Sequence, residues 1–134
     1  METYLRFQTP ICSEHTARPL GIFACVGEIE SSPHVDVAVR EWIRGELDWF
    51  NKNLPVPRLD GYGWRSLFWF RSRSRAMVAR IWELVVVMRD AGLPVQMQRT
   101  SNPGRIVYVD EHQVAAVARR GERSPRRSWS ALRV

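Results

Sequence analysis

The sequence predicts a small two-layer α+β domain, in which a three-stranded, mostly antiparallel sheet packs on helices. Three observations predict this class. Apolar residues recur at helical spacing through the middle of the chain, short alternating segments lie near both ends, and strong stop signals separate them. The expected order is β-α-α-α-β-β. At 134 residues and 45% hydrophobic content, the chain is long and apolar enough for one domain with a buried core.

The first elements come from residues 3–29. Residues 3–8 alternate and contain β-favouring side chains, which predicts a strand. Residues 10–19 are polar and bounded by prolines, which predicts a loop. The next segment predicts a short helix that ends near Ser31 and Ser32, because its apolar residues follow helical spacing. These residues are Ile22, Cys25, Val26 and Ile29.

A second, longer helix is predicted to begin at Pro33 or Asp36 and to end at Asn53. Ser32 followed by Pro33 is a typical start signal, and the Pro-Val-Pro segment at 55–57 ends the helix. One broad apolar face supports the prediction. It consists of Val39, Trp42, Ile43, Leu47, Phe50 and Leu54.

A third helix is predicted from Ser72 or Ser74 to Ala91. Its stop signal is Gly92-Leu93-Pro94, in which glycine takes the position just past the helix, followed by a hydrophobic residue and then proline. The preceding Phe-Trp-Phe at 68–70 is interpreted as a buried structural anchor at the entrance of this helix.

The C-terminal part predicts a hairpin. Residues 95–99 alternate, residues 101–104 form a turn, and residues 106–109 form the second strand, which could continue through 113–118 after a tight turn at 110–112. The N-terminal strand is expected to pair with this hairpin.

Charge separates a domain, residues 1–118, from a tail, residues 119–134. The net charge is +6, but the tail alone carries +5, and the body is close to neutral. The tail is rich in arginine and serine and poor in apolar residues, which predicts a flexible segment.

The sequence also bears on the cellular location of the protein and on whether it is an enzyme. The longest apolar run, residues 84–88, is far shorter than the ~20 residues of a membrane helix. Two cysteines and an N-terminus without a secretory signal favour a cytoplasmic protein. No membrane partner and no cofactor are expected. No familiar nucleophile, phosphate-loop or zinc-protease motif is present, so catalysis is not expected.

Three segments carry a resemblance: ELDWFNKNLPVPR at 46–58, FWF at 68–70 and RTSNPGRIVYVDEHQVAA at 99–116. They resemble a family of small uncharacterised bacterial proteins that pair a WFN-x-NL segment with a PG-x-IVY-x-DE-x-QV segment. The resemblance covers residues 3–118. It implies a domain boundary before the tail, and it implies no activity.

One candidate site combines aromatic and basic residues. If residues 68–75 were extended, an aromatic ring and three guanidinium groups would share a face, as single-stranded nucleic-acid sites require. The tail would add further phosphate contacts. The candidate residues are Trp69, Arg71, Arg73, Arg75, Arg119, Arg120, Arg126 and Arg127.

Two other groups of residues contain side chains of the kinds found in metal sites and catalytic sites. Cys12, His15, Cys25 and His34 are zinc-ligand types, but their spacing is irregular, and Cys25 falls on an apolar helix stripe, so no metal site is expected. Asp110-Glu111-His112 contains acid–base groups. Neighbouring residues of a strand point to opposite faces, so a charged turn is favoured over a catalytic group.

Function is therefore expected to be binding rather than catalysis. The near-neutral body and the six tryptophans favour a protein partner, through a protein–protein interaction module. The alternative is a nucleic-acid-binding protein that uses residues 68–75 and the tail. An unrecognised enzyme is the third alternative.

Overall fold

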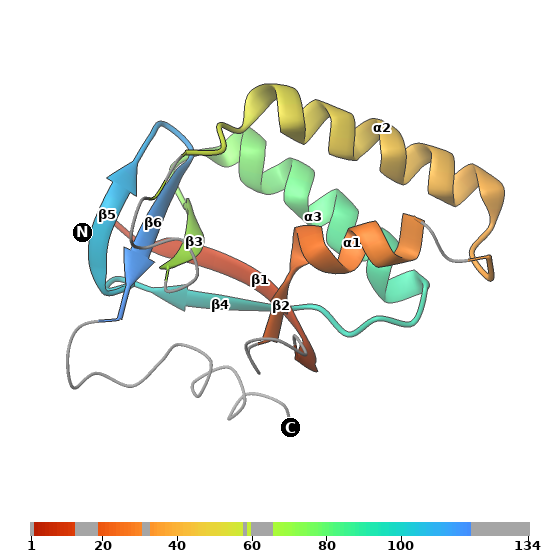
Figure 1. Cartoon of the computed structure of the whole chain (residues 1–134), viewed down its shortest axis with the longest axis horizontal. Coiled ribbons are helices and arrows are strands. Elements are labelled where there is room, and N and C mark those ends of the chain that lie inside the picture. Colours follow the sequence, from red (N-terminus) through yellow and green to blue (C-terminus); the bar gives the residue numbers. More distant parts are fainter. Residues whose placement is uncertain (1, 13–18, 31–32, 58, 60–65, 119–134) are drawn as a thin grey trace. The chain divides into compact units, whose positions relative to one another are not determined.

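The computed structural model describes residues 2–12, 19–30, 33–57, 59 and 66–118. Along the chain, these residues form six strands and three helices. The elements are β1 (Tyr4–Cys12), β2 (Pro19–Gly21), α1 (Ile22–Glu30), α2 (Val37–Asn53), β3 (Ser66–Arg71), α3 (Arg75–Asp90), β4 (Gln96–Thr100), β5 (Arg105–Val109) and β6 (Gln113–Val117). The α+β class is thus confirmed (Figure 1).

The strand count and order predicted from the sequence are wrong. The sheet has six strands in the order β2-β1-β3-β6-β5, with β4 paired to β1, and every register that is defined is antiparallel. The element order is β-β-α-α-β-α-β-β-β instead of β-α-α-α-β-β. The predicted hairpin is also wrong: β5 pairs with β6, whereas β4 pairs with β1.

The missed strand β3 explains most of this error. Phe68-Trp69-Phe70 lies in a strand between β1 and β6, not at the entrance of a helix. Trp69 and Phe70 point to opposite faces of the sheet and are both buried, so β3 is covered on both faces and lacks the alternation that identifies a half-buried strand. Aromatic residues favour strands, and this propensity was the available signal.

The first strand is longer than predicted. β1 continues past Pro10 to Cys12, and the β1–β2 register is irregular between Gln8 and Cys12. Proline cannot donate a ladder hydrogen bond, and irregular positions of a sheet tolerate it. The predicted loop at 10–19 therefore overlaps the end of β1 and the start of β2.

The three helices agree with the prediction to within a few residues. Asp36 is the N-cap of α2, and its carboxylate accepts a hydrogen bond from the Ala38 backbone at 2.8 Å. Gly92 follows α3 with a φ of 92°, and the Leu93 N–H donates to the Met88 carbonyl at 3.0 Å. This is the glycine stop that the sequence predicted.

The described residues belong to two compact units, each built from separate stretches of chain. The first takes Met1–Arg6, Val56–Val78 and Met97–Val134, and the second takes Phe7–Pro55 and Ala79–Gln96. In the first unit, the central apolar cluster lies on one face of β1, β3 and β6. It consists of Tyr4, Trp69, Val114 and Ala116, with Leu67 packed against them.

The second unit contains α1, α2 and most of α3, and these helices contribute most of its buried side chains. Its buried apolar residues include Ile22, Val26, Ile43, Phe50, Ile81, Leu84, Val85 and Met88. Glu46 is also buried, and Arg80 pairs with it at 2.9 Å. The Arg80 guanidinium also lies 4.0 Å from the centre of the Trp49 ring, so this cation has two partners.

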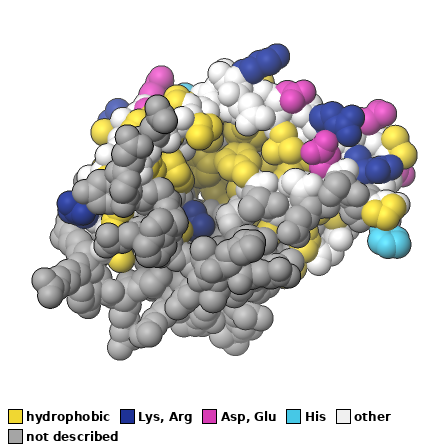
Figure 2. Space-filling view, in the orientation of Figure 1, with side chains coloured by type: hydrophobic (Ala, Val, Ile, Leu, Met, Phe, Trp, Pro, Cys, Tyr) yellow, Lys and Arg dark blue, Asp and Glu magenta, His cyan; other side chains and the backbone are white. Residues whose placement is uncertain are grey.

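Charges of both signs are interspersed on the visible surface along α2 (Figure 2). This agrees with the nearly neutral charge of residues 1–118. Within the described ranges, no helix has the length and apolar content needed to cross a membrane.

Candidate protein-interaction surface

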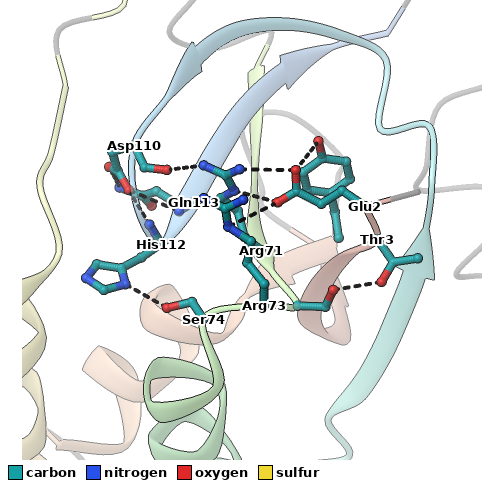
Figure 3. Close-up of polar contacts among 10 residues, drawn as sticks. Glu2, Thr3, Arg71, Arg73, Ser74, Asp110, His112 and Gln113 are labelled. Carbon is teal, nitrogen blue, oxygen red and sulfur yellow. Dashed lines mark hydrogen bonds and ion pairs between the residues drawn. The ribbon is translucent and has the colours of Figure 1, made fainter.

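A polar network occupies the end of β3 and the turn between β5 and β6 (Figure 3). Residues 110–112 form this turn, as the sequence predicted. The Asp110 carboxylate organises it by accepting hydrogen bonds from the backbones of His112 at 2.8 Å and Gln113 at 3.0 Å. It also accepts from the Tyr108 hydroxyl at 2.6 Å and the Gln113 amide at 3.1 Å.

These contacts shift the pKa values of both Tyr108 and Asp110. Burial alone would raise the pKa of Asp110, but the hydrogen bonds from Tyr108, His112 and Gln113 outweigh it and hold this pKa below its usual value. The hydrogen bond to Asp110 raises the pKa of Tyr108 to about 12. At neutral pH the carboxylate is therefore charged and the phenol is a fixed donor.

Arg71, the last residue of β3, links this turn to the N-terminal segment. Its Nε and Nη2 donate to the two carboxylate oxygens of Glu2 at 2.6 and 3.1 Å, and its Nη1 donates to the Asp110 carbonyl at 2.8 Å. The hydrogen bond from Arg71 lowers the pKa of Glu2, and the same bond raises the pKa of Arg71. The guanidinium is thus committed to partners inside the first unit.

Two hydroxyl contacts complete the network. Thr3 Oγ1 lies 2.8 Å from Ser72 Oγ, and Ser74 Oγ lies 2.6 Å from His112 Nδ1. An imidazole beside a hydroxyl can accept its proton. However, the carboxylate paired with the other ring nitrogen is Glu111, 3.9 Å away and 86% exposed. Within the described residues, this pair lacks the buried orienting carboxylate of a serine-hydrolase triad.

The structure places the described residues of the candidate nucleic-acid site in different environments. The Trp69 ring is 1% exposed and lies in the apolar cluster, so it cannot stack on a base in this conformation. Arg71 is paired with Glu2, whereas Arg73 and Arg75 are exposed. Arg119, Arg120, Arg126 and Arg127 lie outside the described residues.

Of the four zinc-ligand types, only Cys25 and His34 have side chains that the structure describes. Cys25 is buried on α1, with its sulfur 3.2 Å from the Thr9 hydroxyl, and His34 is exposed before α2. Cys12 belongs to β1, and His15 lies outside the described residues. Within the described part of the chain, no group of three or more histidine, cysteine or acidic residues is arranged to hold a metal ion.

The edge strand β5 presents the most distinctive surface of the first unit. β5 ends the sheet beside β6, and among the described strands it pairs with β6 alone (Figure 1). Two of its apolar side chains are exposed: Ile106 at 42% and Val109 at 56%. Open edge strands with apolar side chains are sites where another chain can add a strand.

A bulge aligns these two side chains. Ile106 is opposite Ala116 and Val109 is opposite Val114, with a register shift between Ile106 and Tyr108. Directly opposite residues share a face of a sheet, so Ile106 and Val109 lie on the face of Val114 and Ala116. That face carries the buried Trp69 cluster. The exposed pair is therefore an extension of the apolar cluster to the edge of the sheet.

The backbone of β5 points outward at the same two residues. The Asp110 N–H donates to the Gln113 carbonyl at 2.9 Å, so these two residues stand at a hydrogen-bonding position of the ladder. Hydrogen-bonded and non-bonded pairs alternate along an antiparallel ladder. The next pair, Val109 with Val114, is therefore non-bonded, and so is Ile106 with Ala116. The N–H and C=O groups of Val109 and Ile106 accordingly face away from β6.

Sequence reasoning missed this surface because it assigned β5 to the wrong hairpin. The apolar run at 106–109 lacks alternation, so the sequence does not distinguish an exposed edge strand from a strand buried on both faces. Trp42, which the sequence placed on the apolar face of the second helix, is 38% exposed on α2. No family model, no curated protein and no solved structure matches this chain, so the resemblance to a bacterial family stays an expectation.

Proposed function

We propose that the chain is a protein-interaction module whose β5 edge receives an extended segment of a protein partner. The observation that carries this proposal is the coincidence, at Ile106 and Val109, of exposed apolar side chains and outward-facing backbone groups. Strand addition requires both, because main-chain hydrogen bonds supply affinity and side-chain contacts supply specificity.

The charged groups around the turn after β5 include both signs, which supports a protein partner at this edge. Arg71 is neutralised by Glu2, and Glu111 lies exposed beside the end of β5. A surface that binds phosphates needs uncompensated positive charge along its length. Arg73 and Arg75 are exposed, and an exposed arginine without an acidic neighbour would favour the alternative of nucleic-acid binding. Arg73 does not meet this condition fully, because its guanidinium lies 4.0 Å from the Glu2 carboxylate.

The test uses a display library of random 12-residue peptides, selected on the full chain. We expect the selected peptides to be extended and alternately apolar. Binding should be lost in Val109→Pro, which removes one outward N–H but no β5–β6 ladder donor. It should persist in Val86→Lys, which changes a comparably exposed valine on α3.

Two results would contradict the proposal. The first is a set of peptides that bind Val109→Pro as well as the unmodified chain. The second is an absence of selected peptides together with salt-dependent binding of labelled single-stranded DNA or RNA that falls in an Arg73→Ala/Arg75→Ala variant. That second result would favour the nucleic-acid alternative.

A further inference from the structure

The β5 edge has a property that a generic docking strand does not need: it is complementary to itself. The two residues with outward backbone groups, Ile106 and Val109, are also the two exposed apolar residues, and both lie on one face. A twofold axis perpendicular to the sheet would place Ile106 of one copy opposite Val109 of the other. In this register the outward groups of one copy meet those of the other.

We infer that the occupant of the β5 edge is a second copy of this chain, paired antiparallel through β5 in this register. The inference rests on the proposed function of β5 as a docking edge. Each Ile106–Val109 pair would exchange both N–H···O bonds, and the symmetry repeats the pair. The exposed side chains would then pack across the axis and continue the apolar cluster from one copy into the next.

Charge favours the antiparallel arrangement over a parallel one. β5 begins with the basic, exposed Arg105, and Asp110 and the exposed Glu111 follow its end. Antiparallel pairing sets the basic end of one strand beside the acidic end of the other. Parallel pairing would bring like charges together, which is destabilising.

The small size of the β5 edge implies that the dimer is weak. β5 has only five residues, and its bulge limits the length of regular pairing. Such an edge buries less than the ~1,600 Å² of a standard interface, so the dimer should dissociate on dilution. Self-association should therefore depend on concentration.

The experiment is sedimentation equilibrium of the full chain over a series from about 10 μM to 1 mM, a range suited to a small interface. We expect the mean mass to rise from the monomer towards the dimer. Val109→Pro and Ile106→Lys should stay monomeric at every concentration, since lysine on an edge strand opposes strand addition. Val86→Lys should behave as the unmodified chain does. Circular dichroism of each variant confirms that it is folded.

The register has its own test. Ile106→Cys and Val109→Cys are mixed in equal amounts, oxidised, and digested for peptide mass spectrometry. The register predicts a disulfide that joins position 106 of one copy to position 109 of the other, at several times the yield of 106–106 or 109–109 links. The unmodified chain is the control for Cys12 and Cys25.

The two proposals fail separately. A monomer at all concentrations, with display peptides that still require an intact β5 edge, would overturn the second copy and leave the docking edge. A dimer that persists in Val109→Pro and Ile106→Lys would also overturn the inference, because the copies would then meet elsewhere. If the unmodified chain neither self-associates nor binds display peptides, both proposals are overturned.

Discussion

Arg71 holds both carboxylate oxygens of Glu2, with hydrogen bonds of 2.6 Å from Nε and 3.1 Å from Nη2. The third donor used, Nη1, binds the Asp110 carbonyl. One side chain therefore ties the N-terminal segment and the β5–β6 turn to the end of β3. Bidentate pairs of this kind are stronger than single surface contacts because two charge-assisted bonds form in a fixed geometry.

Removing this side chain should destabilise the protein. Arg71→Ala removes two donors from Glu2 and one from the Asp110 carbonyl, and we expect a loss of about 1–3 kcal/mol in the free energy of unfolding. Arg73→Ala is the matched control. Arg73 is 66% exposed and 4.0 Å from Glu2, so its loss should be below about 0.5 kcal/mol. Urea unfolding measures both values, and equal effects would contradict the structural role of Arg71.

The Asp110 turn should give stability a specific pH dependence. The folded pKa of Asp110 is lowered from 3.8, so its contribution is present above that pH and is lost as pH falls through the lower folded value. The unmodified chain should therefore lose its advantage over Asp110→Asn as the pH falls from 5 towards 2. Urea unfolding at several pH values measures this difference. A difference that is constant across the range would show that the carboxylate charge does not stabilise the turn.

Glu2→Gln is the control for this titration, because the pKa of Glu2 is lowered as well. If Asp110 acts independently, the Glu2→Gln chain should keep the acid-dependent loss that Asp110 causes. The Asp110→Asn/Glu2→Gln double variant should then show the weakest pH dependence in this range.

The sequence predicted the helices well because their signals are local. Asp36 at the start of α2 and Gly92 after α3 act within a few residues of the helix ends that they define. The apolar spacing of α1 and α3 likewise repeats within single segments. Each of these features could be recognised without knowing what the element packs against.

The sheet and the candidate surface could not be derived in the same way, because partner choice is not local. Phe68-Trp69-Phe70 shows no alternation, since side chains on both faces of β3 are buried. The Arg71–Glu2 contact joins residues 69 positions apart, and the Ser74–His112 contact joins residues 38 positions apart. The alignment of Ile106 with Val109 depends on a bulge, which shifts the face of one residue and leaves no mark in the sequence pattern.

Gly104 should be irreplaceable for a steric reason. Its φ is 114°, and a Cβ atom there would lie 2.5 Å from the carbonyl oxygen of Val117, at the end of β6. Gly104→Ala must therefore displace the backbone at the start of β5 or the end of β6. Gly92→Ala is the control, because its φ is 92° but nothing lies within 4 Å of the added atom.

We expect Gly92→Ala to cost about 1–2 kcal/mol, the penalty of a positive φ alone. Gly104→Ala should cost clearly more and should also weaken self-association, because it distorts β5. Thermal unfolding and sedimentation of the two variants measure these effects. Similar losses in both would show that the β5–β6 backbone yields without strain.

The Glu46–Arg80 pair should stabilise the second unit far more than the Glu30–Arg44 pair. Glu46 is buried on α2, and Arg80 donates to both of its oxygens, at 2.9 and 3.3 Å. Arg80→Ala would leave a buried carboxylate unpaired and remove the contact with the Trp49 ring. This should cost about 1–3 kcal/mol, less than for a fully buried pair, because the Arg80 side chain is 35% exposed.

Arg44 is the matched control for this comparison. It donates to Glu30 at the same distance of 2.9 Å, but its side chain is largely in solvent, so Arg44→Ala should have little effect on the free energy of unfolding. Urea unfolding of the two variants measures the difference, and a Glu46→Gln/Arg80→Ala double variant isolates the pair itself. If Glu46→Gln restores most of the stability lost in Arg80→Ala, the loss arises from the stranded charge. If it restores none, the packing of Arg80 on Trp49 is the larger contribution.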